Sequence, residues 1–107
     1  MGKIRRPPKP VVYIPPETEI PLRGTVVAQE QELEVGSDGE YMRVLELIEW
    51  EDGREQLRFG YYYRKKGAGE NDWIWAKVAT NIMPETLRRI IVKAKSNPRF
   101  KDTLKGI

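Results

Sequence analysis

The sequence contains no cysteine and no histidine. Without cysteine the chain has no disulfide and no thiolate chemistry. Zinc sites in proteins almost always include one of these two residues, so we expect no zinc. General acid–base catalysis also loses its commonest residue. Only Ser37 and Ser96 carry a serine hydroxyl, and neither lies in a nucleophile motif. We therefore expect no enzyme activity, no catalytic residue, no metal and no cofactor.

Long apolar runs are absent too. No run approaches the roughly 20 residues that a membrane-spanning helix needs. The basic start of the chain is followed by prolines rather than by an apolar region, which is unlike a signal peptide. These observations predict a cytoplasmic protein with no membrane partner. Asparagine and glutamine are scarce, with three of each, while Glu, Lys and Arg are plentiful, a composition that favours a thermophilic source.

Charge is distributed unevenly along the 107 residues. Residues 1–23 carry a net charge of +3, residues 24–83 carry −5 and residues 84–107 carry +5. Basic ends around an acidic middle fit a polyanionic partner better than an even distribution would. The length fits one domain. We divide the chain into a proline-rich basic arm (1–22), an α+β domain (23–97) and a basic C-terminal tail (98–107).

The stretch from Tyr41 to Ala79 organises the chain. Residues 41–50 and 55–64 are rich in aromatic and β-branched residues, and they flank Asp52-Gly53, a strong hairpin signal. Residues 73–79 read as a third strand. Residues 24–35 read as a strand that precedes the hairpin, with a helix as the alternative for residues 29–35 because Glu, Gln and Leu are good helix formers.

A helix follows the strands. Pro84 suits its first turn, with Thr80 or Asn81 as the cap. An apolar stripe at helical spacing then predicts a buried face. The stripe consists of Leu87, Ile90, Ile91 and Ala94. The predicted fold is therefore α+β, an antiparallel sheet of about four strands with one C-terminal helix packed on one face.

The hairpin sets which side chains share a face. With Asp52 and Gly53 as a two-residue turn, Glu46 faces Phe59 and Arg43 faces Tyr62. One face then consists of the even-numbered residues of 42–50 and the odd-numbered residues of 57–63. We expect the helix to pack on this face, against Val44, Phe59 and Val78. Glu46 is the only residue out of place in that core.

The opposite face mixes aromatic rings with cations. Bases of single-stranded nucleic acid stack on such rings at about 1–3 kcal/mol each, while basic side chains follow the backbone. Sheet surfaces suit single strands because their bases can be splayed out. We therefore expect non-catalytic binding of single-stranded nucleic acid on this face. The candidate binding residues are Arg43, Arg58, Tyr62, Arg64, Lys65, Lys66, Trp73, Trp75 and Lys77.

The proline-rich arm has two interpretations. Its cations at positions 3, 5, 6 and 9 either grip phosphate or belong to a solvated tail. An apolar patch at residues 11–14 interrupts the arm, and we expect it to dock on a sheet edge or on a second subunit.

Two other functions stay open. Trp, Tyr and Arg are enriched at protein interfaces, so the aromatic face also fits a homodimeric protein-interaction module, covered by the N-terminal segment or a second subunit. A metal-dependent nuclease is a third hypothesis, with Glu46 its best candidate. The ordinary explanation for Glu46 is a carboxylate that is opposed by an arginine or that lies at the margin of the core.

In element order and character the chain resembles the positive-cofactor-four type transcriptional coactivators. The resemblance covers about residues 25–95, with strands that end at Trp50, Arg64 and Ala79 and a helix that begins at Pro84. It implies a homodimer that binds single-stranded DNA, rather than RNA, on curved sheets.

Overall fold

The computed structural model describes residues 2–76 and 84–105. Five strands form one antiparallel sheet in chain order, β1 (Lys9–Tyr13), β2 (Leu22–Val35), β3 (Gly39–Trp50), β4 (Glu55–Lys65) and β5 (Ile74–Ala76). Helix α1 (Pro84–Lys95) and a short 3₁₀ helix, η1 (Pro98–Phe100), follow. The fold is α+β, as predicted, with one strand more than expected. Residues 29–35 are strand, not helix.

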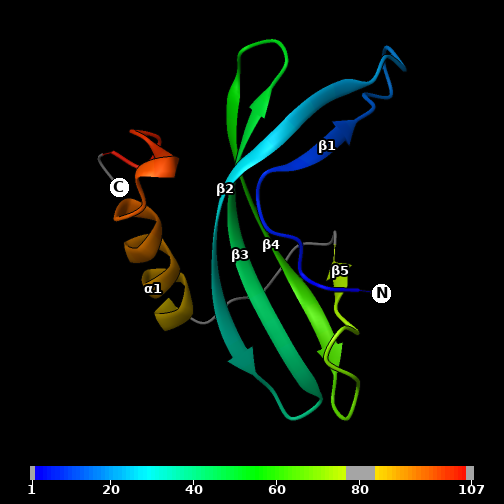
Figure 1. The fold of residues 1–107 in the computed structure, drawn as a ribbon, viewed down its shortest axis with the longest axis vertical. Coiled ribbons are helices and arrows are strands. Elements are labelled where there is room, and N and C mark those ends of the chain that lie inside the picture. Colours follow the sequence, from blue (N-terminus) through cyan, green and yellow to red (C-terminus); the bar gives the residue numbers. More distant parts are fainter. Residues whose placement is uncertain (1, 77–83, 106–107) are drawn as a thin grey trace.

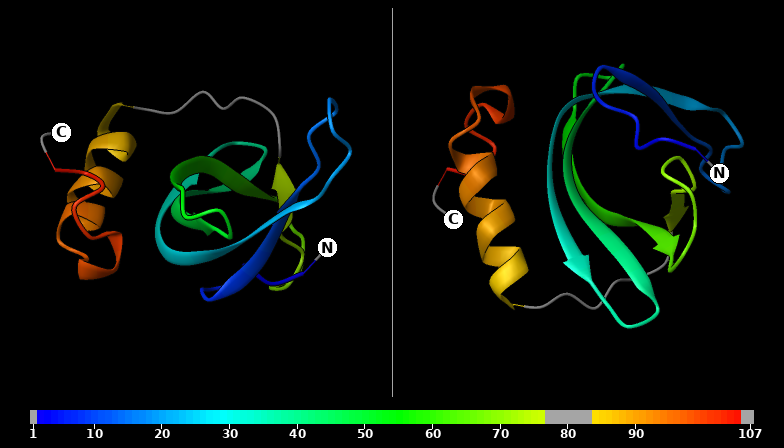
Figure 2. Two further views of the ribbon diagram at one scale, coloured as in Figure 1. Left: turned by 90° about the horizontal axis from the view of Figure 1, so that it is seen from above. Right: turned by 60° about the horizontal axis from the view of Figure 1, so that its bottom comes forward.

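The sheet curls into a half-barrel (Figures 1 and 2). Helix α1 lies against its convex face, while β1 and the chain before it close over its concave face (Figure 2). We call residues 2–8 the strap, because they cross the concave face between the two edges of the sheet. No helix among the described residues is long and apolar enough to cross a membrane.

The β3–β4 connection corrects the predicted register. Trp50 N–H donates to the Arg54 carbonyl at 2.9 Å, so three residues form the loop instead of two. Gly53 adopts φ +90°, the left-handed conformation that closes a three-residue hairpin loop. Glu46 therefore faces Arg58, and Arg43 faces Tyr61. Relative to β4, this shift of one residue places every side chain of β3 on the face opposite to the predicted one.

Helix α1 consequently packs on the face of β3 opposite to the one predicted, but on the predicted face of β4. Its buried Ile90 and Ala94 contact Leu45 and Leu47 of β3, with Phe59 partly buried beside them. Of the predicted contacts, Phe59 is confirmed and Val44 lies on the concave face. Val78 and the predicted caps Thr80 and Asn81 lie outside the described residues. In the predicted stripe Ile90 and Ala94 are buried, whereas Leu87 is 37% exposed.

A β-bulge in β2 lets neighbouring residues serve two cores. The pairing shifts between Val26, opposite Ile48, and Ala28, opposite Leu47. Both residues are fully buried, but Ala28 belongs to the convex core under α1 while Val26 packs with Ile48 and Trp50 on the concave side. The extra residue of the bulge interrupts the regular alternation of side chains between the two faces, so Val26 and Ala28 point to opposite faces.

The two end segments are part of the packed structure. The apolar patch at residues 11–14 lies at a sheet edge as expected, because Lys9–Tyr13 pair with β2 as strand β1. At the other end, Phe100 and Leu104 are buried in the convex core. Lys101 forms ion pairs with Glu49 and Glu55 of the sheet. The boundaries drawn after residues 22 and 97 therefore do not mark where packing ends.

Candidate functional site

Most of the predicted aromatic and basic residues of β4 and β5 lie together on the concave face. Arg58 and Tyr62 flank Gly60 along β4, and Trp75 of β5 pairs with Tyr62. The Arg58 Cζ lies 5.1 Å from the Trp75 ring centroid, and the Tyr62 and Trp75 rings are 4.9 Å apart. Trp75 therefore has a cation against one side and a ring against the other.

Gly60 makes this arrangement possible. A Cβ atom at position 60 would lie 2.5 Å from Cη2 of Trp75, closer than real contacts allow. The indole of Trp75 thus lies directly over the β4 backbone, between Arg58 and Tyr62. A glycine in a strand interior commonly marks such a close approach.

We expect Gly60→Ala to push Trp75 off the sheet. The new methyl group has to displace the indole, which should destabilise the protein by about 1–3 kcal/mol, as overpacking typically does. Urea unfolding and near-ultraviolet circular dichroism would measure the loss and the change around tryptophan. Gly2→Ala is the control, because a Cβ atom there has nothing within 4 Å. Equal stability of the two variants would contradict the placement of Trp75.

Beside Trp75 the concave face opens into a groove of about 650 Å³. It lies between β1 on one side and β4 with β5 on the other. Trp50 forms part of its lining, and its Nε1 donates to the Gln56 amide oxygen at 2.8 Å. The β1 wall includes Tyr13, which is 51% exposed. The full lining consists of Val11, Val12, Tyr13, Ile48, Trp50, Gln56, Leu57, Arg58, Phe59, Trp75 and Ala76.

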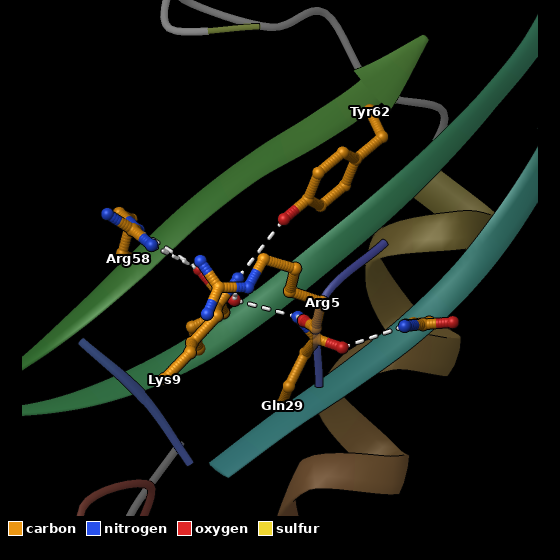
Figure 3. A network of polar contacts seen from close by, with 7 residues as sticks. Arg5, Lys9, Gln29, Arg58 and Tyr62 are labelled. Carbon is orange, nitrogen blue, oxygen red and sulfur yellow. Dashed lines mark hydrogen bonds and ion pairs between the residues drawn. The ribbon is translucent and has the colours of Figure 1, made fainter. Parts of the chain in front are cut away.

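A buried carboxylate lies under this face (Figure 3). Glu46 has no exposed surface. Its Oε1 accepts from Arg58 Nη2 at 2.8 Å, and its Oε2 lies 2.7 Å from both Lys9 Nζ and Gln29 Nε2. Lys9 Nζ also donates to the Tyr62 hydroxyl at 3.1 Å. Side chains of β1, β2 and β4 thus meet at one residue of β3.

The burial and the hydrogen-bond partners of Glu46 determine its charge. Burial acts to raise the pKa of its carboxyl, because the charged form is harder to keep away from water. The hydrogen bonds from Lys9, Gln29 and Arg58 outweigh burial, so the pKa lies below its ordinary value. Glu46 is therefore a permanent anion at neutral pH, and the prediction that an arginine opposes it is confirmed.

Arg43 does not belong to the site. The corrected register places it on the convex face, where it is 6% exposed and forms an ion pair with Glu34 at 2.7 Å. Its guanidinium also lies near the rings of Tyr41 and Tyr61. It was assigned to the binding face only because the loop was counted as two residues.

The other predicted residues occupy different places. Arg64 and Trp73 are stacked on each other, 4.5 Å from Cζ to ring centroid, and neither lines the groove. Lys65, at the end of β4, and the exposed Lys66 lie seven or more residues from Arg58, about 23 Å along an extended strand. Lys77 lies outside the described residues. Tyr62 is 8% exposed, so it supports Trp75 and is not an open platform.

The contributions of β1 and β2 to the site were not predicted from the sequence. Lys9 is a buried ion-pair partner of Glu46, although the proline-rich sequence around it is typical of a solvated arm. Gln29 likewise points inward from a polar run (Figure 3). The one available signal was Glu46 itself, a carboxylate within an apolar strand that needs partners wherever it is buried.

The arrangement is suited to binding and offers no metal centre in the described part of the chain. No group of three or more acidic residues there could hold a metal ion. Stacked rings, a cation and an open groove are instead the features that planar, negatively charged ligands require. Comparison with protein-family models, with curated proteins and with solved structures found no match, so the site is interpreted from its own residues.

Proposed function

We propose that this chain binds single-stranded nucleic acid, without catalysis, in the groove of the concave face. The observation that carries the proposal is the half-buried Trp75, fixed against Gly60 between Arg58 and Tyr62 at one side of an open groove. A preordered indole loses little side-chain freedom when a base stacks on it. The exposed Tyr13 adds further aromatic surface along the same groove.

The basic residues of the concave face also favour a nucleic-acid ligand. Arg58 lines the groove, and Arg58 and Lys9 together exceed the single charge of Glu46, so this network carries a net positive charge. Lys3, Arg5 and Arg6 of the strap are exposed. The phosphate backbone of a single strand is the polyanion that fits a narrow groove with this combination, whereas a duplex is too wide and hides its bases. The resemblance to the positive-cofactor-four type proteins favours DNA over RNA.

Titration of a labelled oligothymidine with the protein, followed by fluorescence anisotropy, tests the proposal. Affinity should fall with salt, with a slope of about −2 in log–log form if three phosphates are neutralised. Tryptophan emission should be quenched in parallel, because the bases stack on Trp75. An oligoribonucleotide and a duplex of matched sequence serve as comparisons. Absence of binding at low salt would refute the proposal.

A homodimeric interface is the second candidate. The β1–β2 hairpin exposes Tyr13, Ile14 (57%) and Ile20 (69%), an apolar group that a second copy would cover. Prolines at positions 10, 15 and 16 remove backbone donors along this edge, which weakens strand-to-strand pairing. Light scattering at several protein concentrations separates the candidates, since a monomer that binds the oligonucleotide leaves the dimer unsupported.

A further inference from the structure

Three cations gather around one carboxylate on the concave face. Lys9 and Arg58 both contact Glu46, and the Arg5 side chain points from the strap toward the same cluster (Figure 3). Glu46 is the only carboxylate that pairs with any of the three in the described parts of the chain. The cluster therefore has two positive charges in excess. Arg58 uses Nε and Nη2 for Glu46 and is still 32% exposed, so its guanidinium stays accessible from the groove.

The strap crosses the concave face beside this cluster (Figure 2). Gly2 and Trp73 exchange two backbone hydrogen bonds, both 3.0 Å, which tie the strap to the β5 side. The Arg5 carbonyl accepts from Gln29 Nε2 at 3.3 Å, which ties the strap to β2. Beyond these ties lie Trp73 and Arg64, which are not part of the groove lining. The groove lining therefore ends at Arg58, Trp75 and Ala76, beside the cluster toward which Arg5 points.

We infer that the site recognises the end of a single strand through a terminal phosphate. This inference rests on the proposed function and adds to it the class of ligand. A groove whose lining ends at this cluster suits a chain terminus. A terminal phosphate carries about −1.5 to −2 charges at neutral pH, whereas an internal phosphodiester carries one. The excess charge of the cluster matches the terminal group, with Arg5 and Arg58 as its direct partners and buried Lys9 adding its charge from beneath.

The experiment compares three oligothymidines of one length, which carry a 5′-phosphate, a 3′-phosphate or hydroxyls at both ends. The dye is placed at the end opposite the phosphate, and on an internal base in the unphosphorylated strand. Anisotropy titrations at fixed salt give the three dissociation constants. One of the two phosphorylated strands should bind roughly tenfold more tightly than the hydroxyl-ended strand, as charge-assisted hydrogen bonds of this kind allow.

Arg5→Gln tests the assignment in the protein. Arg5 is exposed, so its replacement should leave folding intact. The variant should lose the preference for the phosphorylated end, so that the ratio of its dissociation constants for the hydroxyl-ended and the phosphorylated strand falls close to one, whatever the loss of one cation removes from both affinities. Arg99→Gln is the control, since it removes the same charge from an exposed residue of η1, on the convex side, and should keep the preference.

The outcomes separate this inference from the proposed function. Equal affinity for all three oligonucleotides would overturn end recognition while nucleic-acid binding stands. A preference that survives Arg5→Gln would overturn the assignment to this cluster. Absence of binding by every oligonucleotide would overturn both proposals.

Discussion

Replacing Trp75 by alanine should weaken single-strand binding about five- to 150-fold, the range expected when one base loses its aromatic partner at 1–3 kcal/mol. We expect Trp75 to make the largest aromatic contribution to the binding free energy, because it is held between Arg58 and Tyr62 beside the groove. Its removal takes away the stacking surface and also frees the Arg58 guanidinium from its ring contact. Anisotropy titration at fixed salt measures the effect.

Two variants make the Trp75 result specific. Trp75→Phe keeps a ring over Gly60 and should recover most of the affinity. Tyr41→Ala removes an aromatic side chain from the convex face, where Tyr41 contacts Tyr61 and Tyr63, and should leave binding unchanged. Circular dichroism and thermal melting establish that each variant is folded. If folded Trp75→Ala bound like the wild type, the groove would not be the binding site.

The character of each strand could be predicted from the sequence, whereas the pairing between strands could not. Aromatic and β-branched residues marked β3 and β4 correctly, and Arg58, Tyr62 and Trp75 were grouped on one face. The error came from Asp52-Gly53, because a glycine after aspartate suits the last position of a three-residue loop as well as a two-residue turn. That single residue exchanged the faces of β3, which is why Arg43 and the contacts of α1 were misplaced.

The candidate site was only partly predictable for a related reason. Side chains on one strand can be grouped by alternation, but which strands curl over them depends on the whole fold. Lys9 lies 37 positions from Glu46 along the chain and next to it in space, because β1 is the first strand of the sheet and the sheet curls. Local sequence around Lys9 contains prolines and cations and nothing that indicates burial. The charge of Glu46 was the sole indication that a cation must come from elsewhere.

Replacing Glu46 by alanine should destabilise the protein by about 3–5 kcal/mol, the cost of leaving buried charges without a partner. Lys9 is 7% exposed, and without Glu46 its ammonium group would keep the Tyr62 hydroxyl as its hydrogen-bond partner in the described part of the chain. Urea unfolding at about pH 7 measures the loss. Glu85→Ala is the matched control, because Glu85 pairs with Arg88 on the exposed face of α1 and should cost no more than about 1 kcal/mol.

Lys9→Met in the Glu46→Ala background separates the ion pair from simple packing. Methionine fills a similar volume without a charge, so the double variant should be more stable than Glu46→Ala alone. If the destabilisation came from a cavity, removal of the lysine charge would not restore stability. The comparison therefore assigns the loss to an unpaired cation or to packing.

The dependence of stability on pH gives a second test of the same network. The pKa of Glu46 is lower in the folded protein than in the unfolded chain, so its ion pairs stabilise the fold above the unfolded pKa. That contribution should be lost as the pH falls from the unfolded pKa through the folded one, because the carboxyl is then protonated in both states. The stability difference between wild type and Glu46→Gln should accordingly shrink as the pH is lowered below about 4.5. A stability difference that stayed constant across this pH range would mean that Glu46 stabilises the half-barrel by hydrogen bonding and shape alone. In that case the attraction between its charge and the surrounding cations would have no part in holding β1 against the sheet.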